Sequence, residues 1–189
     1  LDLQNFYVIQ AKLEDLMKGS IIEHIYEELQ RTRFPVEHAS DILRLLMVYK
    51  FGGAYLDLDF ISTKPINVLP NNFIGAETET LFSNGAFQFE RHGKGHEFVR
   101  EMLEDLALNY NRLEWSANGP ALFTRVYRKF CSIPEDMPLT PQTSYPCGIS
   151  VTNSSVFFPV YYTNWMSLFE PTQKESIKDM LKNTVAIHF

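Results

Sequence analysis

Apolar residues recur at intervals of three and four in several stretches of the chain and form short runs between them. The first pattern predicts amphipathic helices, and short apolar runs bounded by Gly, Pro or Asn predict strands. Helices are expected over about 37–50, 96–109 and 121–130, as two short pieces within 12–30, and as further pieces over 165–169 and 172–181. Strands are expected over 72–76, 86–90 and 184–189, with loop and one or two strands over 131–159.

Helices and strands that alternate along a chain imply an α/β domain built around a mixed, mainly parallel sheet. A length of 189 residues with 45% hydrophobic residues is enough to bury a core, and it favours one domain. The sequence shows no internal repeat and no low-complexity tract.

A Gly-Gly pair at 52–53 follows the helix expected over 37–50 and leads into an apolar run that carries Asp57 and Asp59. The glycines allow a tight turn with positive φ. In a regular strand, residues two apart point to the same face, so the two carboxylates would converge. Paired anionic oxygens repel unless a cation lies between them, and hard oxygen ligands favour Mg²⁺ or Mn²⁺.

The alternative for Asp57 and Asp59 is a solvated acidic turn, which is common for this pattern. The helix before them places the pair at the carboxyl end of a strand, the edge where open α/β sheets bind ligands. This context favours a metal site and, because such ions are often bridged to phosphates, a nucleotide-dependent transferase.

Charge and hydropathy exclude some functions. The chain has 17 basic and 23 acidic residues, a net charge of −6 and no basic run, which argues against a nucleic-acid surface. No stretch reaches the ~18 apolar residues of a membrane helix, and no secretory signal opens the chain. Because the chain begins at Leu1, we expect a fragment of a longer protein, with any membrane anchor upstream.

Two groups of motifs occur along the chain in the order of a known family. The first group is Ser40-Asp41-x-x-Arg44, Lys50-Phe51-Gly52-Gly53-x-Tyr55-Leu56-Asp57-x-Asp59-Phe60 and Asn84-Gly85-Ala86-Phe87. The second is His96-Glu97-Phe98, Asn118-Gly119-Pro120, Leu122-x-Thr124-Arg125-Val126, Cys131-Ser132-Ile133, Phe158-Pro159 and Ala186-Ile187-His188. Together these motifs strongly resemble the α1,4-glycosyltransferase family that includes lactosylceramide 4-alpha-galactosyltransferase, and the resemblance covers essentially the whole chain.

The resemblance implies a GT-A type fold, a UDP-sugar donor, Mn²⁺ (or Mg²⁺) and retention of anomeric configuration. It also implies a Golgi membrane protein with a luminal catalytic domain. Residues 1–189 would then be a partial catalytic domain without its first strands. About 1–70 would form its donor- and metal-binding part, and about 71–189 its acceptor-side part.

The resemblance also assigns the metal site and residues near the reacting centre. Asp57 and Asp59 form the DXD motif, and His188 falls where the family has a C-terminal metal ligand. Asn84 falls close to the reacting centre. From the residues alone, His188 is more simply a packing residue, and Asn84-Gly85 is a turn signal.

Donor and acceptor contacts follow from the same resemblance. Asp41 and Arg44 would contact the donor, together with Tyr55 and Asp57. The alternative for Asp41 and Arg44, three apart on one helical face, is a surface ion pair worth well under ~1 kcal/mol. Gly119 and Pro120 would line the acceptor cleft.

Two further features, a disulfide and an N-glycan, depend on the cellular compartment in which the protein folds. Cys131 and Cys147 would form a disulfide under oxidising conditions, and the sequon at Asn153 would accept an N-glycan. Trp165 and Tyr161 could stack on an acceptor sugar, although buried packing is the simpler expectation. His24, His38 and His92 show no spacing that indicates chemistry.

The expected activity is transfer of a hexose, most simply galactose, to a terminal galactose on a glycosphingolipid through an α-1,4 linkage. Alternatives are UDP-GalNAc or UDP-GlcNAc as donor, and a catalytically silent sugar-binding protein. A haloacid dehalogenase-type phosphohydrolase also has a strand ending in Asp-x-Asp, but Ile61 stands where that class has Thr or Val. The sequence does not predict the oligomeric state.

Overall fold

The computed structural model describes residues 7–141 and 147–189. Its α-helices are α1 (Leu13–Met17), α2 (Tyr26–Leu29), α3 (Pro35–Phe51), α4 (Gly93–Asn109), α5 (Pro120–Phe130) and α6 (Lys174–Met180). Its strands are β1 (Gly53–Leu56), β2 (Phe60–Ser62), β3 (Phe73–Ala76), β4 (Phe82–Phe89), β5 (Ser150–Thr152) and β6 (Ala186–His188). Short 3-10 helices are η1 (Glu23–Ile25), η2 (Ile66–Val68), η3 (Ser154–Val156), η4 (Tyr162–Phe169), η5 (Pro171–Gln173) and η6 (Leu181–Asn183).

The strands form a four-stranded sheet in the order β1-β4-β3-β5 and a two-stranded sheet of β2 and β6. The sheet is mixed and the α/β class is confirmed, but the expectation of mainly parallel pairing is wrong for the described residues. β4 pairs antiparallel with both β1 and β3, and only β3 and β5 run parallel. β3 and β4 are joined by a short hairpin connection, and a connection of that length permits only antiparallel pairing.

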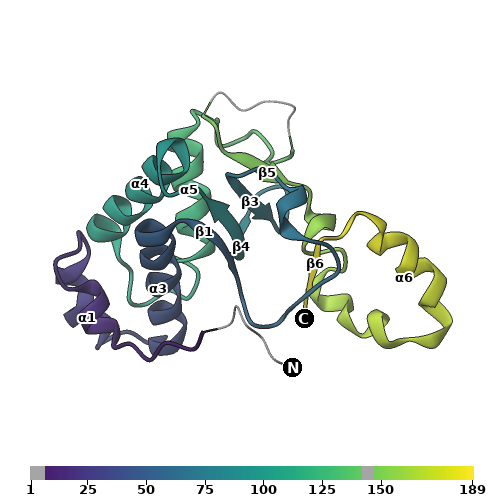
Figure 1. The fold of residues 1–189 in the computed structure, drawn as a ribbon, viewed down its shortest axis with the longest axis horizontal. Coiled ribbons are helices and arrows are strands. Elements are labelled where there is room, and N and C mark those ends of the chain that lie inside the picture. Colours follow the sequence, from purple (N-terminus) through teal and green to yellow (C-terminus); the bar gives the residue numbers. More distant parts are fainter. Residues whose placement is uncertain (1–6, 142–146) are drawn as a thin grey trace.

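Side chains alternate across the sheet and separate two hydrophobic clusters. Ile74 and Phe87 belong to the larger cluster, which is filled by residues of α3, α4 and α5. Phe73 and Ala86 belong to a smaller cluster with Phe157. Successive side chains of a strand point to opposite faces, so each face of the sheet carries one cluster. Figure 1 shows the long helices on one side of the sheet, with β6 and the segment around α6 beyond its other side.

The helix expected over 37–50 is observed as α3, which ends at Phe51 and is capped by Gly52. Gly52 has φ 68° and Gly53 has φ 97°, as the Gly-Gly turn predicts. A Cβ on Gly52 would lie 2.6 Å from the backbone nitrogen of Arg91, so close approach also requires glycine there. The turn therefore sets the direction in which β1 leaves α3.

Two local expectations are wrong. Asn84 and Gly85 lie inside β4 rather than in a turn before it, because the side-chain amide and the backbone oxygen of Asn84 both find partners in the interior, as described below. Asp57 and Asp59 lie after β1 has ended at Leu56, in the turn that leads to β2. Their convergence therefore does not come from a regular strand.

Cys131, at the end of α5, and Cys147, shortly before β5, form a disulfide. It closes a segment with a sequence separation of 16 residues. No helix in the described ranges is long and apolar enough to cross a membrane.

Candidate active site

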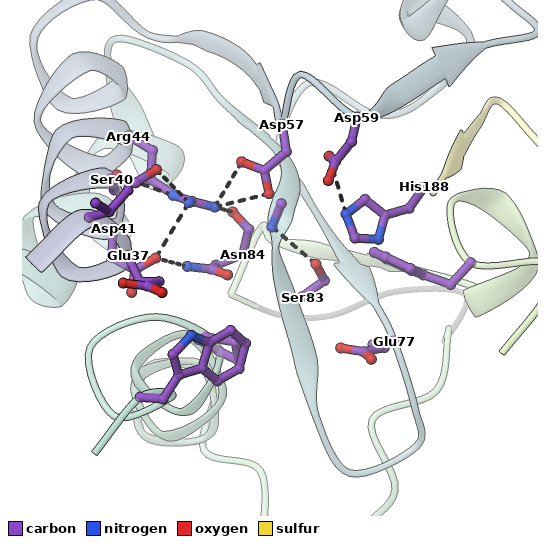
Figure 2. A pocket seen from close by; sticks show the side chains of 15 residues that line it. Glu37, Ser40, Asp41, Arg44, Asp57, Asp59, Glu77, Ser83, Asn84 and His188 are labelled. Carbon is purple, nitrogen blue, oxygen red and sulfur yellow. Dashed lines mark hydrogen bonds and ion pairs between the residues drawn. The ribbon is translucent and has the colours of Figure 1, made fainter. Parts of the chain in front are cut away.

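A cavity of about 430 Å³ opens beside the carboxyl end of β1. Its walls come from α3, the β1–β2 turn, β4, the start of α5 and β6 (Figure 2). The lining residues are Val36, Glu37, Ser40, Asp41, Arg44, Asp57, Asp59, Glu77, Ser83, Asn84, Gly85, Trp115, Pro120, Phe158 and His188. These come from both parts of the chain that the sequence distinguishes, about 1–70 and about 71–189.

Asp57, Asp59 and His188 converge on one wall of this cavity. Each offers one ligand atom, and the three atoms lie within 4.8 Å of one another. Antiparallel pairing of β2 with β6 places His188 opposite Phe60, directly beside Asp59. His188 Nε2 lies 3.3 Å from Asp59 Oδ1, and the imidazole packs 4.7 Å from the Phe60 ring. The interstrand pairing thus brings the C-terminal histidine to the Asp-x-Asp motif.

Arg44 joins the opposite wall to this cluster. Its side chain is 8% exposed. Its Nη1 donates to the backbone oxygen of Asn84 at 2.7 Å and lies 3.3 Å from Asp57 Oδ1. Its Nη2 donates to Ser40 Oγ at 2.8 Å and lies 3.5 Å from Asp41 Oδ1. The guanidinium therefore serves two carboxylates at once, and the pair of Arg44 with Asp41 is buried rather than on the surface (Figure 2).

Asn84 contacts the same carboxylate oxygen of Asp41 that faces Arg44. The Nδ2 of Asn84 donates to Asp41 Oδ1 at 2.6 Å, and both residues are buried. Burial raises the pKa of Asp41, and the charge of Arg44 and the hydrogen bond from Asn84 oppose that rise. Asn84 thus acts as a link between α3 and β4 at the cavity wall.

Tyr55 is not among the described residues that line the cavity, but it contacts Asp57, which does. Its hydroxyl donates to Asp57 Oδ1 at 2.5 Å, and its ring lies 4.7 Å beneath the guanidinium of Arg44. Burial, and next the hydrogen bond to Asp57, raises the pKa of Tyr55 to about 12. The phenol therefore remains a hydrogen-bond donor at neutral pH and holds one oxygen of Asp57.

Two glycines allow the walls to approach. A Cβ on Gly85 would lie 2.7 Å from Asp57 Oδ2. A Cβ on Gly119 would lie 2.5 Å from Asn84 Nδ2 and 2.8 Å from Asp41 Oδ2. Gly119 and Pro120, assigned to the acceptor side by sequence, therefore lie against the Asp41 and Asn84 pair.

Glu77 and Trp115 also line the cavity, although neither belongs to the motifs that carry the family resemblance. Glu77 follows β3, and burial raises the pKa of its carboxyl while the charge of His188 lowers it. Trp115 belongs to a loop that Asn118 closes through hydrogen bonds of 2.9 and 2.7 Å to the backbone of Asn111. Neither residue belongs to a motif that indicates its place in the cavity.

The remaining sequence candidates lie apart from the cavity. Asn153 is exposed and its Oδ1 accepts a hydrogen bond from Ser155 N at 3.0 Å. His38 is buried, with Thr32 Oγ1 at 2.8 Å and the Glu114 backbone oxygen at 3.1 Å from its ring nitrogens.

The donor set of Asp57, Asp59 and His188 fits a divalent cation. Carboxylate oxygens suit Mn²⁺ and Mg²⁺, and an added imidazole favours Mn²⁺ over Mg²⁺. Asp59 and His188 are partly exposed, so an ion has access to them from the cavity. The site combines a place for a cation with buried polar groups on the facing wall.

Comparisons with known proteins agree with this chemistry. Residues 5–80 match the family described as glycosyltransferase sugar-binding region containing DXD motif. The lactosylceramide 4-alpha-galactosyltransferase of Mus musculus is 32% identical over 97% of this chain and 50% of its own length. The alpha-1,4-N-acetylglucosaminyltransferase of Homo sapiens is 28% identical over 89% of this chain and 48% of its own. The chain thus spans about half the length of these curated relatives.

Among solved structures, the PaToxG glycosyltransferase aligns with a TM-score of 0.46 and 22% identity, covering 64% of this chain and 44% of that one. The second family match is to the C-terminal half of the chain, from Arg91 to the end, and it includes the strand that carries His188. Through this match over residues 91–189, the chain belongs to the family described as alpha 1,4-glycosyltransferase conserved region.

Proposed function

We propose that this chain is the catalytic part of a retaining hexosyltransferase that uses a UDP-sugar. One observation carries the proposal: Asp57, Asp59 and His188 converge on the wall of a cavity that also exposes the Asp41, Arg44 and Asn84 network. A donor with a diphosphate and a sugar needs both a cation site and hydrogen-bonding groups within one cavity. Family membership supports the same activity.

Asp57, Asp59 and His188 would hold Mn²⁺, with Mg²⁺ as the alternative ion. When bound, the ion neutralises charge on the departing nucleoside diphosphate. Tyr55 and Arg44 hold Asp57 through both of its oxygens, so its orientation is fixed before the donor arrives. Pre-orientation of this kind lowers the cost of forming the transition state.

The donor sugar would lie against Asp41 and Asn84. Most N–H groups of Arg44 already bond within the protein, so Arg44 contributes mainly by positioning Asp41, Asp57 and the Asn84 backbone. Galactose is the proposed sugar, because most of the similar relatives are named as galactosyltransferases. Because one relative is named as an N-acetylglucosaminyltransferase, UDP-GlcNAc is an alternative donor to UDP-galactose. UDP-GalNAc is the other alternative donor.

For the chemical step we favour front-face transfer. The bond from the anomeric carbon to the diphosphate oxygen breaks, the acceptor oxygen bonds to the same face, and the acceptor proton passes to the departing phosphate. Double displacement would need a carboxylate beneath the anomeric carbon. Of the acidic residues near the β3–β4 hairpin, Glu77 lines the cavity, whereas Glu90 accepts hydrogen bonds from Asn71 and Asn72. A glycosyl adduct trapped on Glu77 would overturn front-face transfer.

The proposed acceptor is a terminal galactose on a glycosphingolipid, and the product linkage is α-1,4. The names of the relatives support the acceptor class and the linkage. We propose a luminal Golgi location from the resemblance to the family of these relatives. They are about twice the length of this chain, so its own activity depends on how much of the donor site lies within residues 1–189.

The test is a donor screen that follows UDP release and product formation with Mn²⁺, lactosylceramide and each UDP-sugar in turn. Turnover with one donor should vanish in Asp59→Ala and Asp57→Ala and persist in Asp136→Asn, a change at an exposed residue outside the cavity. NMR of the product should show the α anomer. Binding of glycans without turnover of any donor, by a folded protein that binds Mn²⁺, would instead establish the silent sugar-binding alternative.

A further inference from the structure

A second cavity of about 360 Å³ adjoins the candidate active site. The two cavities share Glu77, Phe158 and His188. The second is otherwise lined by Val160, Tyr161, Tyr162, Trp165, Leu168 and Phe189. Its volume lies in the range of small-molecule sites, about 300–1,000 Å³. It therefore extends the proposed donor site past His188, on the side away from Arg44.

The geometry of η4 creates the aromatic wall of this cavity. In a 3-10 helix, side chains three residues apart are eclipsed. Tyr162, Trp165 and Leu168 have this spacing, and all three line the cavity. Trp165 is 56% exposed and Tyr161 is 49% exposed, so the expectation that these two aromatic residues are buried packing is wrong. The aromatic faces are available to a ligand.

Glu77 adds a polar group at the junction of the two cavities. Its backbone N–H bonds to Leu81, but no hydrogen bond or ion pair reaches its carboxylate from the residues that the structure describes. A half-buried carboxylate with unused acceptor capacity is suited to hydroxyl donors from a ligand. Figure 2 places Glu77 on the same side of the cavity as His188, away from Arg44.

We infer that this second cavity binds the acceptor saccharide, with one sugar ring against Trp165 and its hydroxyl groups donating to Glu77. A hexopyranose has an apolar C–H face and a rim of hydroxyl groups, which match an aromatic wall with one carboxylate at its edge. The inference rests on the proposed function. Glycosyl transfer requires an acceptor hydroxyl beside the leaving diphosphate, and this cavity meets the donor cavity at His188.

The test compares cavity-lining residues with neighbouring residues outside the cavity, one pair in η4 and one pair in the β3–β4 hairpin. Trp165→Ala and Glu77→Gln should each raise the KM for lactosylceramide and lower kcat/KM by about tenfold or more. Both should retain the wild-type affinity for Mn²⁺ and UDP within about twofold. Met166→Ala and Glu79→Gln change exposed residues outside the cavity and should leave every parameter unchanged.

A second measurement does not depend on turnover. In a Trp115→Phe background, where Trp165 is the remaining tryptophan, lactose added with Mn²⁺ and UDP should change the tryptophan fluorescence, and Glu77→Gln should weaken that response. Unchanged acceptor KM in both variants, or loss of UDP affinity instead, would overturn the inference while the proposed function stands. Absence of turnover in the wild type with a normal lactose response would refute the proposed function alone.

Discussion

Replacing Arg44 is the most direct test of how the candidate active site is held together. Arg44 lies 3.5 Å from one oxygen of Asp41 and 3.3 Å from one oxygen of Asp57, and its side chain is 8% exposed. Arg44→Met keeps a long side chain of similar shape and removes the charge. The two carboxylates would then repel each other, with Asp41 buried and without its cation.

The size of the effect follows from these separations. At about 3.4 Å and an effective dielectric constant of about 20, each ion pair has a Coulomb attraction of about 5 kcal/mol before the cost of desolvation. Measured losses on removing one partner of a buried pair are about 3–5 kcal/mol. Asp57 is 28% exposed and stays partly hydrated, so we expect about 3 kcal/mol for Arg44→Met, most of it from Asp41.

Urea unfolding followed by circular dichroism measures this loss, and two variants test its origin. Asp41→Asn in the Arg44→Met background removes the unpaired charge and should recover about 1 kcal/mol or more. Arg100→Met removes an exposed pair with Glu104, also at 3.3 Å, and should cost less than about 1 kcal/mol. If Arg44→Met costs no more than Arg100→Met, the proposed role of Arg44 in holding the two carboxylates is refuted.

Three further predictions concern the surroundings of this network. Gly85→Ala should weaken Mn²⁺ affinity about tenfold or more in calorimetry, because its Cβ would displace Asp57; unchanged affinity would contradict this. The pKa of Tyr55 is raised to about 12, so its neutral form stabilises the fold fully below pH 10, and this contribution is lost as the pH rises toward 12. Urea unfolding at pH 9 to 11 should therefore show a steeper fall for the wild type than for Tyr55→Phe. Reduction of the Cys131 to Cys147 disulfide should lower the free energy of unfolding by about 3 kcal/mol, and a loss near zero would contradict its role in closing that loop.

The parts of the fold that the sequence predicts well are those set by local chemistry. Helix α3 has an apolar stripe with the period of a helix and ends at a glycine whose φ is 68°. Helix α4 has an equally long periodic pattern, and α5 has a shorter one. The placement of His188 beside Asp59 was expected only by resemblance, because it depends on pairing between β2 and β6, which are far apart in the sequence.

Asn84 shows why a local turn signal fails here. Asn-Gly favours a turn when the side chain has no better partner than its own backbone. In this protein the side-chain amide of Asn84 donates to Asp41 and its backbone oxygen accepts from Arg44, and both partners belong to α3. Burial makes these bonds more valuable than the turn, since unpaired polar groups in the interior are costly. The same contacts that defeat the local prediction build the wall of the cavity.

In the aromatic wall of the second cavity, the type of helix determines which side chains are aligned and so which of them can contact a ligand together. In an α-helix, with about 100° per residue, Leu168 would lie about 120° away from Tyr162 around the axis. In a 3-10 helix the two side chains are aligned, with Trp165 between them. The apolar composition of 162–169 is compatible with either geometry, so the sequence predicts a helical piece with buried aromatic residues. Because the observed turn is the tighter one, these side chains form a continuous ridge beside Glu77, and substitutions at 162, 165 and 168 should affect acceptor binding while Met166→Ala does not.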